Sequence, residues 1–90
     1  MKLKEHFIAR QNFGYRFISS FQKIVSSLPS YVYIGLGDGD ERLANAKSII
    51  GALSLQISNG MGFSIVIMND NEKFAENDMA VIKEWLRQND

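Results

Sequence analysis

The sequence predicts an α+β fold, an open-faced two-layer sandwich with three helices on one face of a four-stranded antiparallel sheet. Three observations predict it. Apolar residues alternate in some segments and recur at helical spacing in others; these segments follow the order β-α-β-β-α-β-α; and the one proline, Pro29, lies between two of them. The 90 residues suffice for one core and not two. We therefore expect a single domain over residues 1–90.

The first half of the chain yields a strand, a helix and a second strand. Phe7 and Ala9 share one face of an extended segment, which predicts a strand over residues 6–9. A helix follows and ends before Pro29, because the residue preceding a proline resists helical geometry. Its apolar stripe consists of Phe17, Phe21, Ile24, Val25 and Leu28. Alternating β-branched and aromatic residues then predict a strand over residues 31–36.

The second half begins with a hairpin at residues 37–40, Gly-Asp-Gly-Asp, followed by a short returning strand at residues 42–44. A short helix over residues 48–55 is expected to bury Ile49, Ile50 and Leu53. Residues 63–68 are predicted as a strand. The last helix, over residues 75–88, has acidic residues near its start, which suits the helix dipole. Its apolar stripe consists of Met79, Ile82, Trp85 and Leu86.

Composition excludes several classes of protein. Ten basic and ten acidic residues give a net charge of zero, so the chain lacks the basic surface of a dedicated nucleic-acid binder. With no cysteine and only one histidine, His6, disulfides, thiol catalysis and a multi-histidine metal site are excluded. No apolar run is long enough to span a bilayer, and no secretory signal is visible. We expect a cytoplasmic protein without metal, cofactor or membrane partner.

Three motifs that faintly suggest chemistry fail on their spacing or context. A phosphate-binding loop before Lys47 would need glycines where Ala46 and Glu41 stand. The two aspartates of the hairpin supply too few oxygen ligands for a cation. His6 has no nucleophile motif near it that would indicate a catalytic triad. The sequence therefore predicts no catalytic residue, and we expect the protein not to be an enzyme.

Ser48 stands at the start of the short predicted helix and has two interpretations. Its side-chain oxygen is suited to accept a backbone N–H as an ordinary N-terminal cap. Alternatively it is a phosphorylation switch, since a phosphate adds nearly two negative charges where the helix dipole favours them. Ile49 and Ile50 would then lie beside the phosphate. Gly51, inside the helix, indicates close packing or a closely approaching partner.

Residues 46–55, Ala-Lys-Ser-Ile-Ile-Gly-Ala-Leu-Ser-Leu, resemble the regulatory-serine segment of HPr. HPr is the histidine-containing phosphocarrier of the bacterial phosphoenolpyruvate:sugar phosphotransferase system. The Lys-Ser-Ile-x-Gly stretch with its flanking leucines carries most of the resemblance. Residues 58–60, Ser-Asn-Gly, and residues 75–80, Ala-Glu-Asn-Asp-Met-Ala, are also similar to HPr. The order of elements agrees over nearly the whole chain.

The sequence departs from HPr where the family carries its chemistry. HPr proteins have Gly-[Leu/Ile]-His-x-Arg-Pro-Ala where the first strand meets the first helix, and residues 12–18 here read Asn-Phe-Gly-Tyr-Arg-Phe-Ile. Gly14 falls on the phosphorylated histidine, Arg16 on the motif arginine and Phe17 on the helix-starting proline. Phosphotransfer needs a nucleophile, and glycine has none. The hairpin at residues 37–40 is also longer than in the family.

The resemblance implies a regulatory interaction module that is similar to HPr paralogues without the histidine. Ser48 would be the target of an ATP-dependent HPr kinase/phosphorylase. The partners would be proteins of sugar-transport or catabolite regulation, among them a transcriptional regulator. The expected protein- or anion-binding residues are Tyr15, Arg16, Phe17, Lys47, Ile49, Ile50 and Gly51.

Two alternatives remain open from the sequence. One is a residual phosphocarrier that uses Tyr15 or His6, although a phenol is a poor substitute for an imidazole and His6 lies eight positions before Gly14. The other is an HPr fold repurposed for unrelated protein binding, because a fold does not fix a function. In that case the aromatic loop around Phe13 and Tyr15 and the long hairpin are the features that would bind.

Overall fold

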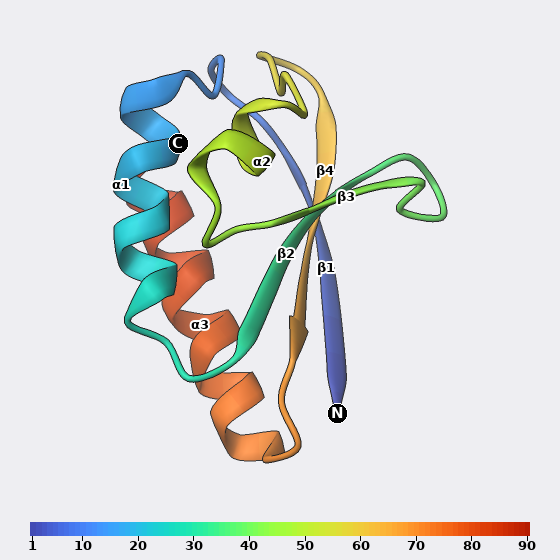
Figure 1. Cartoon of the computed structure of the whole chain (residues 1–90), viewed down its shortest axis with the longest axis vertical. Helices are drawn as coiled ribbons and strands as arrows, with labels where there is room; N and C mark the ends of the chain where they lie inside the picture. Colours follow the sequence, from blue (N-terminus) through green and yellow to red (C-terminus); the bar gives the residue numbers. More distant parts are fainter.

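The chain folds in the predicted order of strands and helices, and the computed structural model describes all residues, 1–90 (Figure 1). The elements are β1 (Lys2–Ile8), α1 (Tyr15–Ser26), β2 (Tyr31–Leu36), β3 (Arg42–Asn45), α2 (Ile49–Leu53), β4 (Gly62–Met68) and α3 (Glu72–Asn89). This confirms the predicted α+β sandwich. No helix is both long and apolar enough to cross a membrane.

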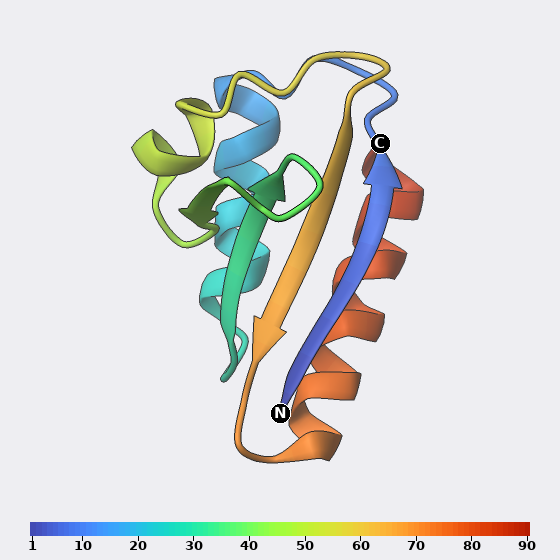
Figure 2. The same cartoon turned by 90° about the vertical axis from the view of Figure 1, so that its right-hand side faces the viewer.

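The four strands form one antiparallel sheet in the order β1-β4-β2-β3. The three helices lie on one face of this sheet, and the other face is uncovered (Figures 1 and 2). β4 and β2 occupy the centre and pair with Ile65 opposite Ile34 and Ile67 opposite Val32. β1 and β3 are therefore the two edges of the sheet.

A cluster of twenty buried apolar residues fills the space between the sheet and the helices. In α1, Phe21 and Val25 are buried as predicted, together with Ile18, while Phe17 and Ile24 are half-buried. Leu28, the last member of the predicted stripe, is half-buried two residues past the end of the helix. In α3, Met79, Ile82 and Leu86 are buried, and Trp85 is half-buried. The helical periodicities therefore identified the core-facing sides of the two long helices, although the stripe assigned to α1 omitted Ile18.

The first strand is longer than predicted, since β1 begins at Lys2 and not at residue 6. Lys2 and Lys4 lie on the uncovered face, where polar side chains meet solvent. On the helix-facing side, Glu5 interrupts the apolar alternation. A charged residue fits this position because β1 is an edge strand, and the carboxylate of Glu5 forms an ion pair with Lys83 of α3 at 3.1 Å. A strand with charges on both sides carries only a weak alternating signal.

The short helix α2 also differs from its prediction. It covers only Ile49–Leu53, and Ile50 is 83% exposed, so the expectation that Ile50 is buried was wrong. Ile49 and Leu53 are half-buried, while Ala52 and the residues that follow the helix, Leu55 and Ile57, enter the core. A helix of little more than one turn has too few residues for its own stripe to fix which side is buried.

The last helix begins three residues earlier than predicted, at Glu72. The side chain of Asn71 accepts a hydrogen bond from the backbone N–H of Phe74 at 3.1 Å. This N-cap satisfies one of the free N–H groups of the first turn. The prediction missed it because Phe74 is exposed and lies outside the apolar stripe.

Candidate functional site

The N-terminus of α1 presents free backbone N–H groups to solvent. Gly14 is the N-cap, with φ −81° and ψ −173°, and it provides no side-chain cap. The first turn contains no acidic residue. The N–H groups of its first residues lack helical acceptors, and Arg16 adds a positive charge on an exposed side chain. This helix end is suited to a nearby anion, but Gly14 supplies no nucleophile.

Aromatic packing holds this helix end in place. The ring of Phe13 stacks on Phe17 with centroids 4.1 Å apart and meets Phe63 edge-on at 5.2 Å. The backbone N–H of Phe13 donates to the carbonyl of Ile57 at 2.9 Å. Phe17 also contacts the ring of Trp85 at 5.2 Å and is half-buried. Phe13 and Phe17 therefore belong to the packing beneath the site, which leaves Phe13 unavailable as the aromatic contact considered for it.

Ser48 is the N-cap of α2, as its position predicted. Its Oγ accepts a hydrogen bond from the backbone N–H of Gly51 at 3.1 Å, while the residue as a whole stays exposed. A Cβ at Gly51 would lie only 3.1 Å from that oxygen, so close packing accounts for the glycine. Ile49 turns toward the core and Ile50 toward solvent.

Lys47 is not brought together with Arg16. Its Nζ donates to the carbonyl of Leu28 at 3.2 Å, just beyond the C-terminal end of α1. Arg16 stands at the other end of α1, a twelve-residue helix about 18 Å long. The two cations therefore do not share one anion site, and the ammonium of Lys47 stabilises the end of a helix whose carbonyls carry partial negative charge.

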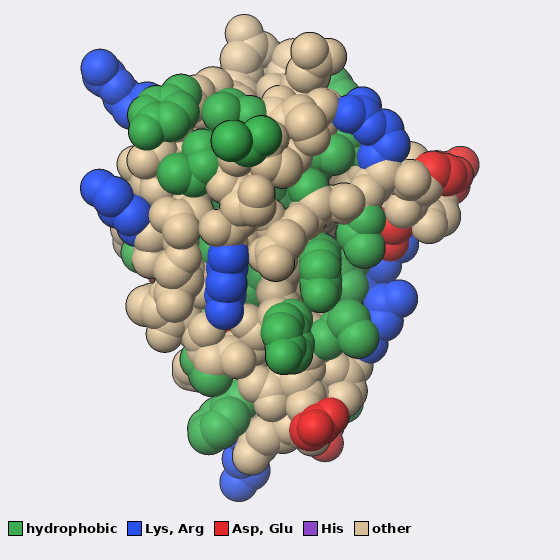
Figure 3. Space-filling model, viewed as in Figure 1, with side chains coloured by type: hydrophobic (Ala, Val, Ile, Leu, Met, Phe, Trp, Pro, Cys, Tyr) green, Lys and Arg blue, Asp and Glu red, His purple; other side chains and the backbone are tan.

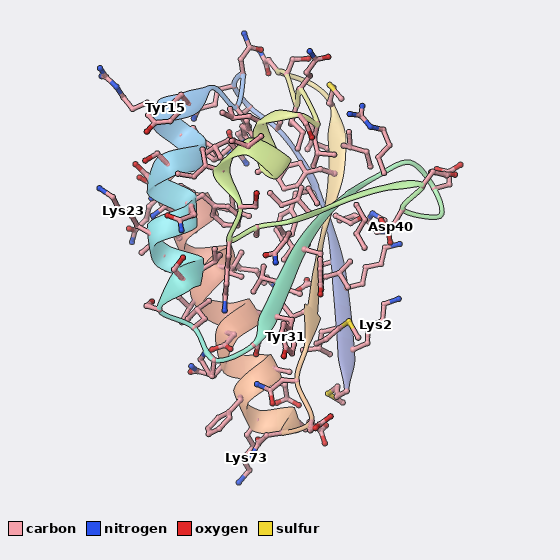
Figure 4. All side chains as sticks on the ribbon, viewed as in Figure 1. Lys2, Tyr15, Lys23, Tyr31, Asp40 and Lys73 are labelled. Atoms are coloured by element: carbon pink, nitrogen blue, oxygen red, sulfur yellow. The ribbon has the colours of Figure 1, made fainter.

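The exposed residues of the site lie at one end of the molecule. We call the surface formed by Tyr15, Arg16, Ser48 and Ile50 the α1–α2 surface. Tyr15 is 66% exposed at the start of α1, and α2 lies beside this end of α1 (Figures 1 and 4). Figure 3 shows hydrophobic side chains over the start of α1 and over α2, on the same face of the molecule. The α1–α2 surface thus combines two exposed apolar side chains with a cation and a hydroxyl.

His6 lies on the other side of the molecule. It belongs to the set of β1 residues that point to the uncovered face of the sheet, and its Nδ1 is 2.9 Å from the Oγ of Ser64 on β4. The sheet separates it from α1. No group of three or more histidine or acidic side chains comes together that could hold a metal ion.

The long hairpin folds back against the uncovered face, which the sequence did not indicate. The Oδ2 of Asp40 lies 2.7 Å from the Nζ of Lys4, and the same carboxylate lies over Gly35. Asp40 has a φ of +55°, a left-handed conformation that aspartate tolerates better than most residues. Asp40 is therefore occupied by an ion pair within the chain.

No protein-family model matches the sequence, and no curated protein matches it. Solved structures do: HPr-C-His from Thermoanaerobacter tengcongensis superposes with a TM-score of 0.76 at 19% identity, over 99% of this chain and 93% of that one. The chain has the HPr fold.

Two further structures with the HPr fold agree. The phosphocarrier protein HPr from Bacillus anthracis str. Ames gives a TM-score of 0.76 at 21% identity, over 93% of this chain and 95% of that one. A histidine-containing phosphocarrier protein from Mycoplasma gives 0.64 at 20% identity, over 96% of each chain. The resemblance seen in the sequence is thus confirmed at the level of the fold.

Proposed function

We propose that this protein is a phosphotransferase-system-related interaction module with the HPr fold, that it does not carry phosphate on a histidine, and that it binds regulatory proteins through the α1–α2 surface. The observation that carries the proposal is the N-terminus of α1, where Gly14 leaves the backbone N–H groups free and offers no side chain. An HPr-like helix end that favours anions is retained there without a group able to take a phosphoryl group.

The geometry argues against a substitute nucleophile. His6 points to the uncovered face of the sheet, whereas α1 lies on the covered face. Tyr15 stands next to Gly14, but its phenol extends into solvent and makes no hydrogen bond to a base within the chain. Neither side chain is held where an imidazole at position 14 would stand. We therefore place the residual-phosphocarrier alternative second.

Ser48 is proposed as the switch of the α1–α2 surface. Its hydroxyl is exposed at the start of α2, next to the solvent-facing Ile50. A phosphate there would add nearly two negative charges beside an apolar contact residue and within the field of the helix N-terminus. A partner with a basic side chain next to an apolar pocket would distinguish the modified from the unmodified protein.

The proposed partners are an HPr kinase/phosphorylase and a transcriptional regulator of sugar use. The protein would bind them in the cytoplasm. Tyr15 and Ile50 supply the exposed apolar contacts that anchor protein interfaces. Arg16 supplies a charge for orientation. Lys47 and Phe17 are left out of the contact surface proposed here, since one binds the end of α1 and the other packs among aromatic rings.

Incubation with HPr kinase and labelled ATP tests the switch. We expect one phosphate on the wild-type protein and none on Ser48→Ala. Ser54→Ala is the matched control, because Ser54 is an exposed serine of the same segment whose hydroxyl donates to the carbonyl of Gly51. Equal labelling of Ser48→Ala and wild type would contradict the assignment of Ser48.

Incubation with labelled phosphoenolpyruvate and enzyme I, the phosphotransferase-system protein that phosphorylates HPr, tests the absence of phosphocarrier activity. We expect no protein-bound label. Acid-labile label that disappears in His6→Ala, or stable label that disappears in Tyr15→Phe, would instead establish the residual phosphocarrier.

A pull-down whose regulatory partners are lost with Ile50→Asp, but not with Lys73→Glu on α3, would support the α1–α2 surface. Recovery only of proteins unrelated to sugar regulation would favour a repurposed fold.

A further inference from the structure

The outer edge of β1 is a row of unpaired backbone groups. Met1 and Ala9 bond to the strand beside them: the N–H of Asn69 donates to the carbonyl of Met1 at 3.0 Å, and the N–H of Ala9 to the carbonyl of Met61 at 2.9 Å. In an antiparallel pair such bonding residues alternate, so the odd-numbered residues of β1 face β4. The even-numbered ones direct their N–H and C=O groups outward; they are Lys2, Lys4, His6 and Ile8.

The free edge ends at Arg10. Its backbone N–H donates to both oxygens of the Asp90 carboxylate at 3.1 Å, and the side chain of Gln11 donates to the carbonyl of Asn89 at 2.8 Å. The end of α3 therefore occupies the edge just after β1. From Lys2 to Ile8, no other segment of the chain pairs with the outer side of β1.

A groove lies beside one end of this edge, where β1 reaches Phe7 and Ile8. Its volume is about 730 Å³, and its apolar lining is Phe7, Ile8, Phe63, Ala80 and Leu86. Figure 2 shows α3 lying behind β1 and extending past its outer side. A strand added next to β1 would thus have α3 beneath it. Near Phe7 and Ile8, every second side chain of that strand would enter the groove, because side chains of neighbouring strands share a face.

The charges along the edge specify what the added strand should carry. The carboxylates beside it are already engaged: Glu5 with Lys83, Glu84 with Arg87, and Asp90 with the backbone of Arg10. The side chains of Lys2 and Arg10 form no ion pair. They mark the two ends of the edge, eight residues apart, or about 27 Å in an extended chain. Figure 4 shows Lys2 directed away from the fold.

A second copy of this chain fits the edge poorly. Its own β1 would bring Lys2, Lys4 and His6 to the face where the free cations need a negative partner. Lysines on an edge strand commonly serve to prevent such self-pairing. The uncompensated charge therefore favours a different, acidic strand.

We propose that the edge of β1 binds an extended peptide segment of another protein as a fifth strand. The segment would have an acidic residue at each end, one opposite Lys2 and one just past Ile8, directed to the side chain of Arg10. Apolar residues would occupy every second position between them, and those near Phe7 would fill the groove. Main-chain hydrogen bonds would supply affinity and the alternating side chains specificity. This surface lies away from the α1–α2 surface and does not depend on the function proposed for it.

A nine-residue peptide, Glu-Val-Thr-Val-Thr-Val-Thr-Val-Glu, is the probe. Its palindromic pattern presents both acids in either direction. On binding, amide hydrogen exchange should slow at the backbone N–H groups of Lys4, His6 and Ile8, which are unpaired in the free protein. The N–H groups of Leu3, Glu5 and Phe7 bond to β4 and should be protected throughout, which verifies that the sheet is intact. The same peptide with lysine at both ends should bind about tenfold more weakly.

The double variant Lys2→Glu/Arg10→Glu tests the charge assignment. It should reverse the preference, binding the lysine-ended peptide about tenfold more tightly than the acidic one. Lys23→Glu, an exposed change on α1 at the opposite side of the molecule from β1 (Figure 4), should leave the preference unchanged. Three results would overturn the proposal: no binding of the acidic peptide at millimolar concentration, binding without protection of the even-numbered amides, or dimers of the chain alone in which those amides are already protected.

Discussion

The carboxylate of Asp78 in α3 accepts hydrogen bonds from both the hydroxyl and the backbone N–H of Ser30, which lies just before β2, and both residues are buried. The side chain of Asn69 donates to the same hydroxyl at 3.0 Å. The network joins the turn after α1, the loop after β4 and the first half of α3. The other carboxylate oxygen of Asp78 has no partner, so all of the compensation for burying this acid comes from Ser30.

We predict that Asp78→Ala lowers the free energy of unfolding by about 2–4 kcal/mol, because it leaves buried donors of Ser30 without an acceptor. Urea unfolding followed by the fluorescence of Trp85 measures it. Asp70→Ala, at an exposed position of the preceding loop, is the control and should change the value by less than about 0.5 kcal/mol. Equal effects of the two substitutions would show that the network does not stabilise the fold.

The contact between the hairpin and the sheet predicts the effect of Gly35→Ala. A Cβ there would clash with the carboxylate of Asp40, so the Asp40 side chain must move away and its ion pair with Lys4 is disturbed. We expect a loss of about 1–3 kcal/mol in urea unfolding. Gly39→Ala is the control, since a Cβ at that position meets nothing closer than 3.8 Å.

The same substitution in an Asp40→Gly background should cost clearly less, because the clashing carboxylate is gone. A cost that stays the same in both backgrounds would mean that Asp40 does not rest on Gly35 in solution.

A second double-mutant cycle concerns Ser48 and Gly51. Ser48→Ala should cost about 1 kcal/mol through loss of the N-cap. Gly51→Ala gains helix propensity but brings its Cβ within 3.1 Å of the Ser48 hydroxyl. We predict that Gly51→Ala is more favourable by about 1 kcal/mol when residue 48 is alanine. Additive effects would argue that the Ser48 hydroxyl does not lie against residue 51, where a cap of α2 would place it.

The pair Glu84–Arg87 gives a pH prediction. Hydrogen bonds from the Arg87 guanidinium, at 2.6 and 2.9 Å, lower the pKa of Glu84 from 4.5 to about 2. A depressed pKa in the folded state means that the pair stabilises the protein above pH 4.5 and that this contribution is lost as the pH falls toward about 2.

The difference in unfolding free energy between wild type and Glu84→Gln should therefore be largest at neutral pH and disappear near pH 2. Because both groups are solvent-exposed, high salt should reduce it. Glu76→Gln, an exposed acid of the same helix without an ion pair, should show no such pH dependence. A difference that persists unchanged at acidic pH would contradict the assignment.

Local patterns were sufficient where one side of an element was clearly apolar. Residues 31–36 were predicted as a strand with the bounds the structure shows, because Val32 and Ile34 alternate with tyrosines. Ser48 was predicted as a cap and caps α2. Patterns failed at Glu5 and Ile50, where position at the sheet edge or in a very short helix decides exposure.

The amino-acid sequence alone determined the order of strands and helices, the core side of the two long helices and the absence of an imidazole at position 14, since each depends on neighbouring residues or on identity at one position. Only the tertiary structure decided which groups meet from distant segments. It placed Lys47 at the far end of α1 from Arg16, buried Asp78 against Ser30 and left one edge of β1 unpaired beside a groove. The reason is that such contacts depend on how the sheet and helices pack, and no local spacing encodes the partner of a side chain fifty residues away.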